Sequence, residues 1–236
     1  MPTAVVTGAG ARVGRAIALE LAAAGYDVVV HVHTNLQGGR ETARLVEALK
    51  RRATVVAADL TKEEEAETLF ASTLGDAAVV VHAASVFEKT PLATTSAAMI
   101  ESVIAADLLA PLLVARAAAS QLTRTRGALL FVLDIGGVER PWKNYAAYCA
   151  ARAGLAAAIE VLALELAPNV RVNGIAPGLV LPAKTMDAQE IARRESHIPL
   201  GKHGTPDDVS RAVLFLVQAK HITGAILPID GGRRLA

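Results

Sequence analysis

A tyrosine and a cation stand four residues apart in the segment from Tyr145 to Arg152. The segment is expected to be helical, and residues four apart share one face of a helix, so Tyr148 and Arg152 are expected to be neighbours. A nearby cation favours the phenolate and lowers a phenol pKa that starts near ~10. The pair has the residue types of a general acid or base, although a surface tyrosine–arginine pair without a chemical role has the same spacing.

A glycine-rich run from Thr7 to Gly14 lies between the first predicted strand and a helix. Gly8 and Gly14 permit a positive φ and let the backbone approach a pyrophosphate, while the helix N-terminus offers free N–H groups. The order strand, glycine run and helix predicts a dinucleotide site at Gly8, Arg12, Val13 and Gly14. An ordinary tight turn is the alternative.

The end of the second predicted strand, His31 to Asn35, carries no carboxylate. An acidic residue there would bind the ribose 2′-hydroxyl of NAD, so its absence favours NADP(H) over NAD(H). We expect His33, Thr34 and Asn35 to contact the adenosine end, and Arg12 and Arg40 to add positive charge. Asp59 and Leu60, after the third strand, are expected at the adenine; a helix-capping role for Asp59 is equally compatible with its position.

These residues require a scaffold of alternating strands and helices. The apolar pattern predicts strands at 4–6, 28–30, 54–56, 78–82, 129–133, 170–175 and 225–229. It predicts helices at 13–24, 39–50, 96–122 (kinked at Pro111), 145–167 and 206–218, and another helix after Thr61 as its N-cap. Continuous apolar strands suit a parallel sheet covered on both faces. We therefore predict one α/β domain over residues 1–236, a doubly wound, Rossmann-like parallel sheet. Residues 177–206 are expected to form a substrate loop with a short helix near 187–195.

Composition narrows the class of protein. The chain has 236 residues, 53% hydrophobic, a net charge of +1 and one cysteine, Cys149, so it cannot form an intrachain disulfide. The charge argues against nucleic-acid or anionic-membrane partners, and the basic clusters 50–52 and 233–234 are interpreted as solvated charge. Without a signal-peptide pattern or a long apolar run, we expect a soluble cytoplasmic protein. The remaining histidines, His197, His203 and His221, lack metal-ligand spacing, so no metal is expected.

The chain resembles the short-chain dehydrogenase/reductase family over nearly its whole length. Thr7-Gly8-x-x-x-Arg12-x-Gly14 resembles the cofactor motif of that family, and Tyr148-x-x-x-Arg152 its Tyr-x-x-x-Lys motif. Residues 171–178 resemble the strand before its substrate loop, and residues 229–232 its C-terminal signature. Within the family the chain looks most like pteridine reductases, through the His-x-His strand end, Asp134 in the place of a serine, residues 139–145 and the loop 176–182.

The resemblance implies hydride transfer from the nicotinamide of NADP(H) to a C=N or C=O bond. Tyr148 would give or take the proton, Arg152 would hold the nicotinamide ribose and poise Tyr148, and Asp134 would position or help protonate the substrate. Pro177 and Gly178 are expected on the cofactor, and the small-molecule substrate would enter over Phe87, Leu179 and Trp142. Family members usually form tetramers. A 3-oxoacyl-thioester or other carbonyl reductase, and a dinucleotide-binding protein with weak or no catalysis, are the alternatives.

Four departures from the family pattern meet at this site. Arg152 replaces the lysine, and Asp107 stands where the long helix usually carries an asparagine. Asp134 lies 14 positions before Tyr148, one more than usual, so either the loop has an extra residue near Gly136-Gly137 or Ile135 takes the serine's place. Relatives read Asn-Asn-Ala-Gly where this chain has His82-Ala83-Ala84-Ser85, and the resemblance implies that Ala83, Ala84 and Ser85 contact the cofactor. These departures put catalytic turnover in question.

Overall fold

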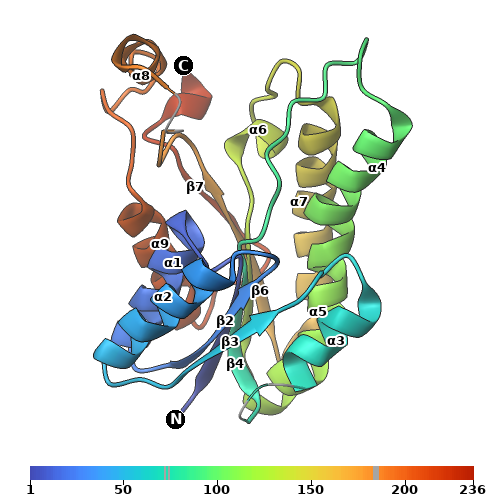
Figure 1. Ribbon diagram of the computed structural model, residues 1–236, viewed down its shortest axis with the longest axis vertical. Coiled ribbons are helices and arrows are strands. Elements are labelled where there is room, and N and C mark those ends of the chain that lie inside the picture. Colours follow the sequence, from blue (N-terminus) through green and yellow to red (C-terminus); the bar gives the residue numbers. More distant parts are fainter. Residues whose placement is uncertain (72, 74, 183–185) are drawn as a thin grey trace.

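Seven parallel strands form one sheet in the computed structural model, which describes residues 1–71, 73, 75–182 and 186–236 (Figure 1). The strand order is β3-β2-β1-β4-β5-β6-β7. Strands β2 and β3 are added on one side of β1 and strands β4 to β7 on the other, so the order of strands reverses between β1 and β4. The strands are β1 (Thr3–Thr7), β2 (Asp27–Val32), β3 (Ala53–Ala57), β4 (Ala77–His82), β5 (Ala128–Val132), β6 (Arg171–Pro177) and β7 (Ile226–Ile229). The predicted doubly wound parallel sheet is confirmed.

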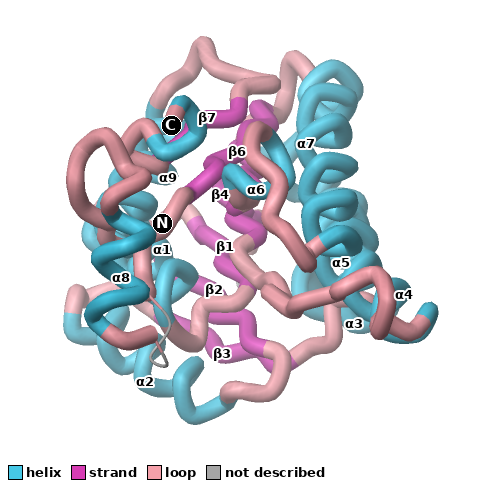
Figure 2. The backbone as a smooth tube through the Cα atoms, turned by 90° about the horizontal axis from the view of Figure 1, so that it is seen from above, coloured by secondary structure: helices cyan, strands magenta, loops and turns pink. Residues whose placement is uncertain are grey.

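Helices cover both faces of the sheet, as continuous apolar strands require (Figure 2). One layer consists of α1 (Arg12–Ala23), α2 (Leu36–Ala48) and α9 (Pro206–Gln218). The opposite layer consists of α3 (Glu63–Ala71), α4 (Ala97–Ile104), α5 (Ala110–Thr125) and α7 (Ala146–Leu166). Two shorter helices, α6 (Ile135–Val138) and α8 (Ala188–Glu195), lie at the carboxyl edge of the sheet.

The core consists of two apolar layers made almost entirely of alanine, valine, leucine and isoleucine. Val6, Val30 and Leu130 face α1 and α9, whereas Leu129 and Phe131 face α5 and α7. With only 3% aromatic residues in the chain, small side chains fill these layers and bring the helices close to the sheet. A rigid two-sided core of this kind fixes the strand ends from which the candidate site is built.

The predicted elements agree with the structure apart from three local differences. Helix α2 begins at Leu36, three residues before the predicted start, because the Asn35 side chain accepts a hydrogen bond from Gly38 N and caps it. Thr61 does not cap α3, which begins at Glu63; its hydroxyl donates to Asp59 instead. The short helix α6 was not predicted.

The long helix predicted over 96–122 is interrupted by one π-helical turn, Ala105–Leu109, between α4 and α5. Pro111 explains the interruption, because proline has no N–H and its ring crowds the carbonyl four residues before it. The Ala110 N–H donates to the Ala105 carbonyl, five residues back. The turn places Asp107 in the protein interior, where it is fully buried.

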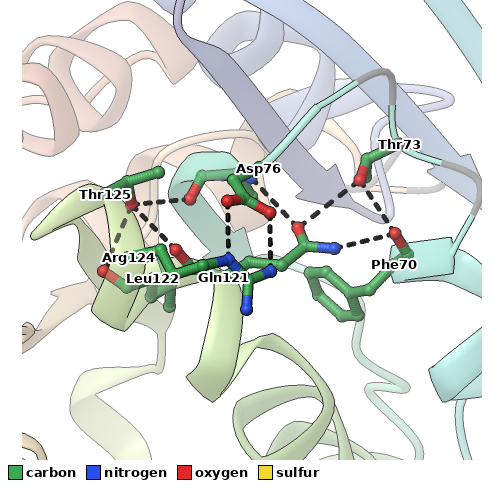
Figure 3. Close-up of polar contacts among 8 residues, drawn as sticks. Phe70, Thr73, Asp76, Gln121, Leu122, Arg124 and Thr125 are labelled. Atoms are coloured by element: carbon green, nitrogen blue, oxygen red, sulfur yellow. Dashed lines mark hydrogen bonds and ion pairs between the residues drawn. The ribbon is translucent and has the colours of Figure 1, made fainter.

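The opposite end of this layer is anchored by polar contacts between α5 and the α3–β4 connection (Figure 3). Gln121 donates to the Phe70 carbonyl and accepts from the Ala77 N–H at 3.0 Å. Arg124 makes a two-pronged contact with Asp76 at 2.6 and 2.7 Å. These contacts fix α5 at the amino edge of the sheet, far from the carboxyl edge that carries the cavity.

Two helices are long and apolar enough to cross a membrane by length and composition, Ala97–Thr125 and Ala146–Leu166. Both pack one side against the sheet, and they carry Asp107, Tyr148 and Arg152. Their outer sides expose Ile104, Leu109, Val161 and Leu164. A helix that packs on a core and leaves an apolar outer face is typical of a subunit interface as well as of a membrane segment.

Candidate active site

A cavity of about 780 Å³ opens at the carboxyl edge of the sheet, the size range of small-molecule sites. In doubly wound sheets, ligands bind at this edge, where the strand order reverses. Twelve of the predicted site residues line this cavity: Arg12, Val13, Ala83, Ser85, Phe87, Asp134, Trp142, Tyr148, Arg152, Pro177, Gly178 and Leu179. Asp107 lies behind the wall, and Gly8, Gly14, Ala84, His33, Thr34, Asn35, Asp59 and Leu60 are not among the lining residues.

The glycine-rich run has the shape of a phosphate-binding loop. Gly8 has φ +64°, and a Cβ there would lie 2.8 Å from Ala84 Cα, so only glycine fits. Helix α1 follows, and no side chain caps its N-terminus because Ala11 occupies the N-cap position. Its first N–H groups therefore lack an intrahelical or side-chain partner and point to a site for an anion. These residues fit the pyrophosphate of a dinucleotide.

The buried His31 ring holds the glycine-rich loop through hydrogen bonds. The Gly8 N–H donates to its Nδ1 at 3.3 Å, and its Nε2 lies 3.0 Å from the Ala58 carbonyl on the neighbouring strand. These contacts assign the Nε2–H tautomer, and burial lowers the pKa of His31, so the ring stays neutral. Of the two histidines, His31 is thus a buried support of the loop, and only the exposed His33 is free to face a ligand.

The unusual His82-Ala83-Ala84 segment is tied to β1 through Thr7. The Thr7 hydroxyl accepts from the N–H groups of Ala83 and Ala84 and lies 3.1 Å from His82 Nδ1. Because both acceptor positions of the hydroxyl are used, its proton goes to His82 Nδ1. Burial lowers the pKa of His82 to about 3, so the ring is neutral. His82 thus takes part in fixing the end of β4 to β1.

At the adenosine end, His33, Thr34 and Asn35 are exposed after β2, and Arg40 is exposed on α2. Asp59 accepts from the Thr61 N–H and hydroxyl and pairs with Lys62 at 3.6 Å; the Thr61 bonds lower the pKa of Asp59. These contacts favour its local capping role. The Leu60 side chain is buried in the core, so the backbone of Leu60 is the part that a cofactor could contact.

Tyr148 and Arg152 lie on one face of α7, with the Arg152 Cζ 5.3 Å from the Tyr148 ring centroid. Phe87 stacks on Tyr145 at 4.4 Å and meets Tyr148 edge-on at 5.0 Å. Despite these contacts Phe87 remains 56% exposed. Tyr148, which is expected to transfer a proton, therefore contacts the aromatic rings of Phe87 and Tyr145 and the guanidinium of Arg152.

Arg152 is held by a buried ion pair. Its Nη2 lies 2.8 Å from Asp107 Oδ1, both side chains are at most 1% exposed, and Nη1 donates to the Val132 carbonyl at 3.2 Å. The Ser85 hydroxyl donates to the same Asp107 oxygen at 2.7 Å. Burial raises the pKa of Asp107, and the Arg152 guanidinium and the Ser85 bond oppose the rise. The departures at 107 and 152 thus contact each other, and Asp107 acts on the site through Arg152.

Arg152 does not bring the pKa of Tyr148 toward neutral pH, contrary to the expectation from the spacing of the two residues. Burial raises the pKa of Tyr148 well above its ordinary value, and the lowering effect of Arg152 is smaller. Asp134 and Asp107 add to the rise. Tyr148 is consequently protonated at neutral pH, which is the form that gives a proton to a substrate.

Asp134, not Ile135, faces the cavity, since Ile135 is fully buried and absent from its lining. Asp134 Oδ1 accepts from the Gly136 N–H and from Trp142 Nε1, at 2.5 and 2.8 Å. A Cβ on Gly136 would lie 1.8 Å from Trp142 Nε1, so this glycine makes room for the indole, and Gly137 does the same for Arg152, whose Cβ would lie 2.1 Å from an added Cβ. Asp134 is therefore first an anchor for Trp142, and burial raises its pKa.

The described parts of the substrate loop that line the cavity after β6 are residues 177–181, Met186, Arg193, Arg194 and His197. Arg12, on the glycine-rich run, donates to the Leu181 carbonyl at 2.9 Å, so its guanidinium contacts the substrate loop. Residues 183–185 of the predicted loop lie outside the described residues. The expected short helix is present as α8, and it brings Arg193 and Arg194 to the cavity.

The sequence analysis missed Arg233. It was interpreted as solvated charge, yet it is 9% exposed and lines the cavity. Its neighbour Arg234 pairs with Asp230 and Glu139. The position directly after Asp230-Gly231-Gly232, a signature already noted, was the available signal. Among the described residues, no cluster of histidine, cysteine and carboxylate side chains suits a metal ion.

Comparisons with known proteins agree with this geometry. Residues 8–234 match a family described as enoyl-(acyl carrier protein) reductase. The chain is 33% identical to 3beta-hydroxysteroid dehydrogenase 1 of Eggerthella lenta, over 99% of this chain and 94% of that protein. It is 33% identical to carbonyl reductase family member 4 of Danio rerio, covering 98% of each chain. It is 31% identical to the 3-oxoacyl-[acyl-carrier-protein] reductase of Bos taurus, over 98% of this chain and 97% of that protein.

Proposed function

The chain belongs to the short-chain dehydrogenase/reductase family of oxidoreductases, and from this premise we propose that it is an NADP(H)-dependent reductase of a C=O bond. The observation that carries the proposal is the placement of Tyr148 and Arg152, with the Arg152 Cζ 5.3 Å from the Tyr148 ring centroid, in a cavity that begins at the glycine-rich loop. The named relatives include a carbonyl reductase and a 3-oxoacyl reductase, both of which act on carbonyl groups by name. A small-molecule carbonyl compound is the corresponding substrate.

Several groups of the chain fit this reaction. When bound, the nicotinamide supplies the hydride, which adds to the carbonyl carbon. Tyr148 holds the proton that the carbonyl oxygen takes up, and its raised pKa keeps that proton in place at neutral pH. Arg152, fixed by Asp107, offers positive charge beside the phenol and favours the phenolate that remains. The uncapped start of α1 and the Gly8 turn would hold the pyrophosphate.

Support for NADP(H) comes from the end of β2. The exposed residues there are His33, Thr34 and Asn35, none of which would repel a 2′-phosphate. The nearby Asp59 carboxylate is occupied by Thr61 and Lys62. Titration of the purified protein with NADPH and NADH, read by nicotinamide fluorescence, tests this choice: tighter NADPH binding supports it, and tighter NADH binding overturns it.

A pteridine-type substrate with a planar C=N group is the second candidate. Phe87, stacked on Tyr145 yet 56% exposed, offers a ring on which a planar heterocycle can stack. Both candidates are tested by NADPH oxidation with a 3-oxoacyl thioester, a simple ketone and an oxidised pterin that carries the C=N bond. The substrate with the highest kcat/KM decides between them, and Tyr148→Phe serves as the control. No oxidation with any carbonyl or pterin substrate would favour a dinucleotide-binding protein without catalysis.

We also propose that the protein assembles into a homotetramer in the cytoplasm. The support is the apolar outer side of the α4–α5 and α7 layer, where Val161 is 51% and Leu164 is 82% exposed. When a second copy of the chain packs against this face, the apolar area of both copies is removed from water. Sedimentation of the purified protein, and fractionation of cells that produce it, are the corresponding tests.

A further inference from the structure

Positive charge is concentrated in the cavity, although the chain as a whole has a net charge of only +1. Among the described lining residues one carboxylate, Asp134, faces eight cations. The eight are Arg12, Lys89, Arg140, Lys143, Arg152, Arg193, Arg194 and Arg233. A cavity with low-dielectric walls and one sign of charge attracts ligands of the opposite sign.

Arg233 differs from the other cations because it is buried without a counterion. Arg152 pairs with Asp107 and Arg194 pairs with Glu190, whereas no carboxylate of the described chain lies within 4 Å of the Arg233 guanidinium. Its Nη1 donates to the Arg194 carbonyl at 3.1 Å, and its Nε is buried with no acceptor. A buried charge without a partner is costly, so this arrangement points to a missing anion.

The surrounding contacts keep Arg233 in this state. The adjacent Arg234 takes both local carboxylates, Asp230 and Glu139. Arg140 donates to the Arg233 carbonyl at 3.0 Å, which adds a second cation. Burial, with Arg140 and Arg194 as like charges, lowers the pKa of Arg233, and the more distant Asp134 and Asp230 carboxylates oppose this only in part.

Trp142 fixes the position of the guanidinium. The Arg233 Cζ lies 5.1 Å from the Trp142 ring centroid, and the indole is itself held by Asp134. The Asp134 carboxylate affects the pKa of both Tyr148 and Arg233, so it lies within electrostatic reach of each. Tyr148, Asp134 and Arg233 therefore line one and the same cavity.

We infer that Arg233, with Arg140 and Arg194 beside it, binds an anionic group of the substrate, so that the enzyme prefers small carbonyl compounds that carry a carboxylate or a phosphate. That the bound anion belongs to a substrate rests on the proposed carbonyl reduction. The anion site itself is defined by contacts that do not depend on that reaction. A charged hydrogen bond from arginine to such a group selects the anionic compound over its neutral ester.

The single tryptophan of the chain provides a direct readout, because Trp142 lies under the Arg233 guanidinium. Titration of the wild type with acetate, citrate and inorganic phosphate at constant ionic strength should change the fluorescence of Trp142 in a saturable way. In Arg233→Gln the saturable change should disappear, and Arg233→Lys should weaken it. Arg44→Gln, which removes an exposed arginine from α2, is the matched control and should behave as the wild type. Comparison of citrate and acetate with phosphate distinguishes a carboxylate site from a phosphate site.

Kinetics provide the second readout. For keto acids assayed beside their methyl esters, Arg233→Gln should raise the KM of the acid roughly 10-fold to 100-fold, the range for a hydrogen bond to a charged group, and leave the ester unchanged. Equal loss for acid and ester would overturn the inference, as would anion responses that survive in Arg233→Gln. A Trp142 response to an acidic carrier protein, with none to small anions, would overturn it in favour of protein docking. If no carbonyl compound is reduced, the fluorescence titration still decides whether the anion site exists.

Discussion

Replacing Asp107 by asparagine removes the charge that faces Arg152 and keeps the size of the side chain. The two groups meet at 2.8 Å and are at most 1% exposed, so the variant leaves a cation buried without its counterion. Breaking a buried pair in this way costs about 3–5 kcal/mol. For a chain of this size each kcal/mol lowers the melting temperature by roughly 2 °C, so we expect a decrease of about 6–10 °C.

A double-mutant cycle separates coupling from simple damage. Arg152→Lys keeps a charge but has a different reach, and the combination Asp107→Asn/Arg152→Lys reproduces the residue pair expected from the family resemblance. We expect the double variant to be less destabilised than the sum of the single variants by about 1–3 kcal/mol, the range for residues in contact. Thermal and urea unfolding measure the change in the free energy of unfolding for the two single variants and for the double variant.

The matched control is Glu41→Gln, which breaks an exposed ion pair of similar length, 2.9 Å, with Arg44. Because exposed pairs contribute little, its melting temperature should equal that of the wild type. The reasoning is refuted if Asp107→Asn melts within about 2 °C of the wild type, the shift that corresponds to about 1 kcal/mol. If the destabilisation of the double variant equals the sum of the two single values, the coupling between Asp107 and Arg152 is refuted, but the cost of the unpaired charge is not.

Three further predictions concern proton transfer, cofactor choice and assembly. Burial raises the pKa of Tyr148, so kcat/KM for carbonyl reduction should stay flat to about pH 10, the ordinary tyrosine value; a pH profile whose alkaline limb lies below pH 9 would contradict this. His33→Asp places a carboxylate at the end of β2, so NADPH affinity should fall at least about 10-fold through charge repulsion while NADH affinity is kept, as measured by fluorescence titration; His221→Asp, at an exposed position that does not line the cavity, is the control. Leu164→Glu adds charge to an apolar position that is 82% exposed, so analytical ultracentrifugation should show smaller assemblies at unchanged melting of the subunit fold; an unchanged sedimentation coefficient would exclude this face as an interface.

Local sequence patterns were enough to predict most of the fold. Thr205, Pro206 and Asp208 mark the start of α9 with a capping box, and the predicted bounds match the structure. The β-branched runs marked all seven strands. The start of α2 was missed because Gly38-Gly39 reads as a loop, whereas the Asn35 side chain caps a helix that contains both glycines. Here a single hydrogen bond outweighs poor helix propensity.

The candidate site was predictable where its residues are close in sequence. Tyr148 and Arg152 are one helical turn apart, and the glycine-rich run is continuous. The pairing of Arg152 with Asp107 depends on a π-helical turn and on the packing of two helices, which sequence spacing does not describe. Arg233 was misjudged for the same reason: its burial depends on Trp142 and on Arg234 taking the nearby carboxylates.

The most direct test of the proposed function uses NADPH that carries deuterium at the transferable position. The wild type is incubated with a carbonyl substrate, and the product is examined by mass spectrometry, with Tyr148→Phe in parallel. The proposed mechanism predicts one deuterium on the carbinol carbon and a rate that falls at least about 100-fold in Tyr148→Phe, the lower range for loss of a general acid. A product without deuterium, or an unchanged rate in Tyr148→Phe, would contradict it.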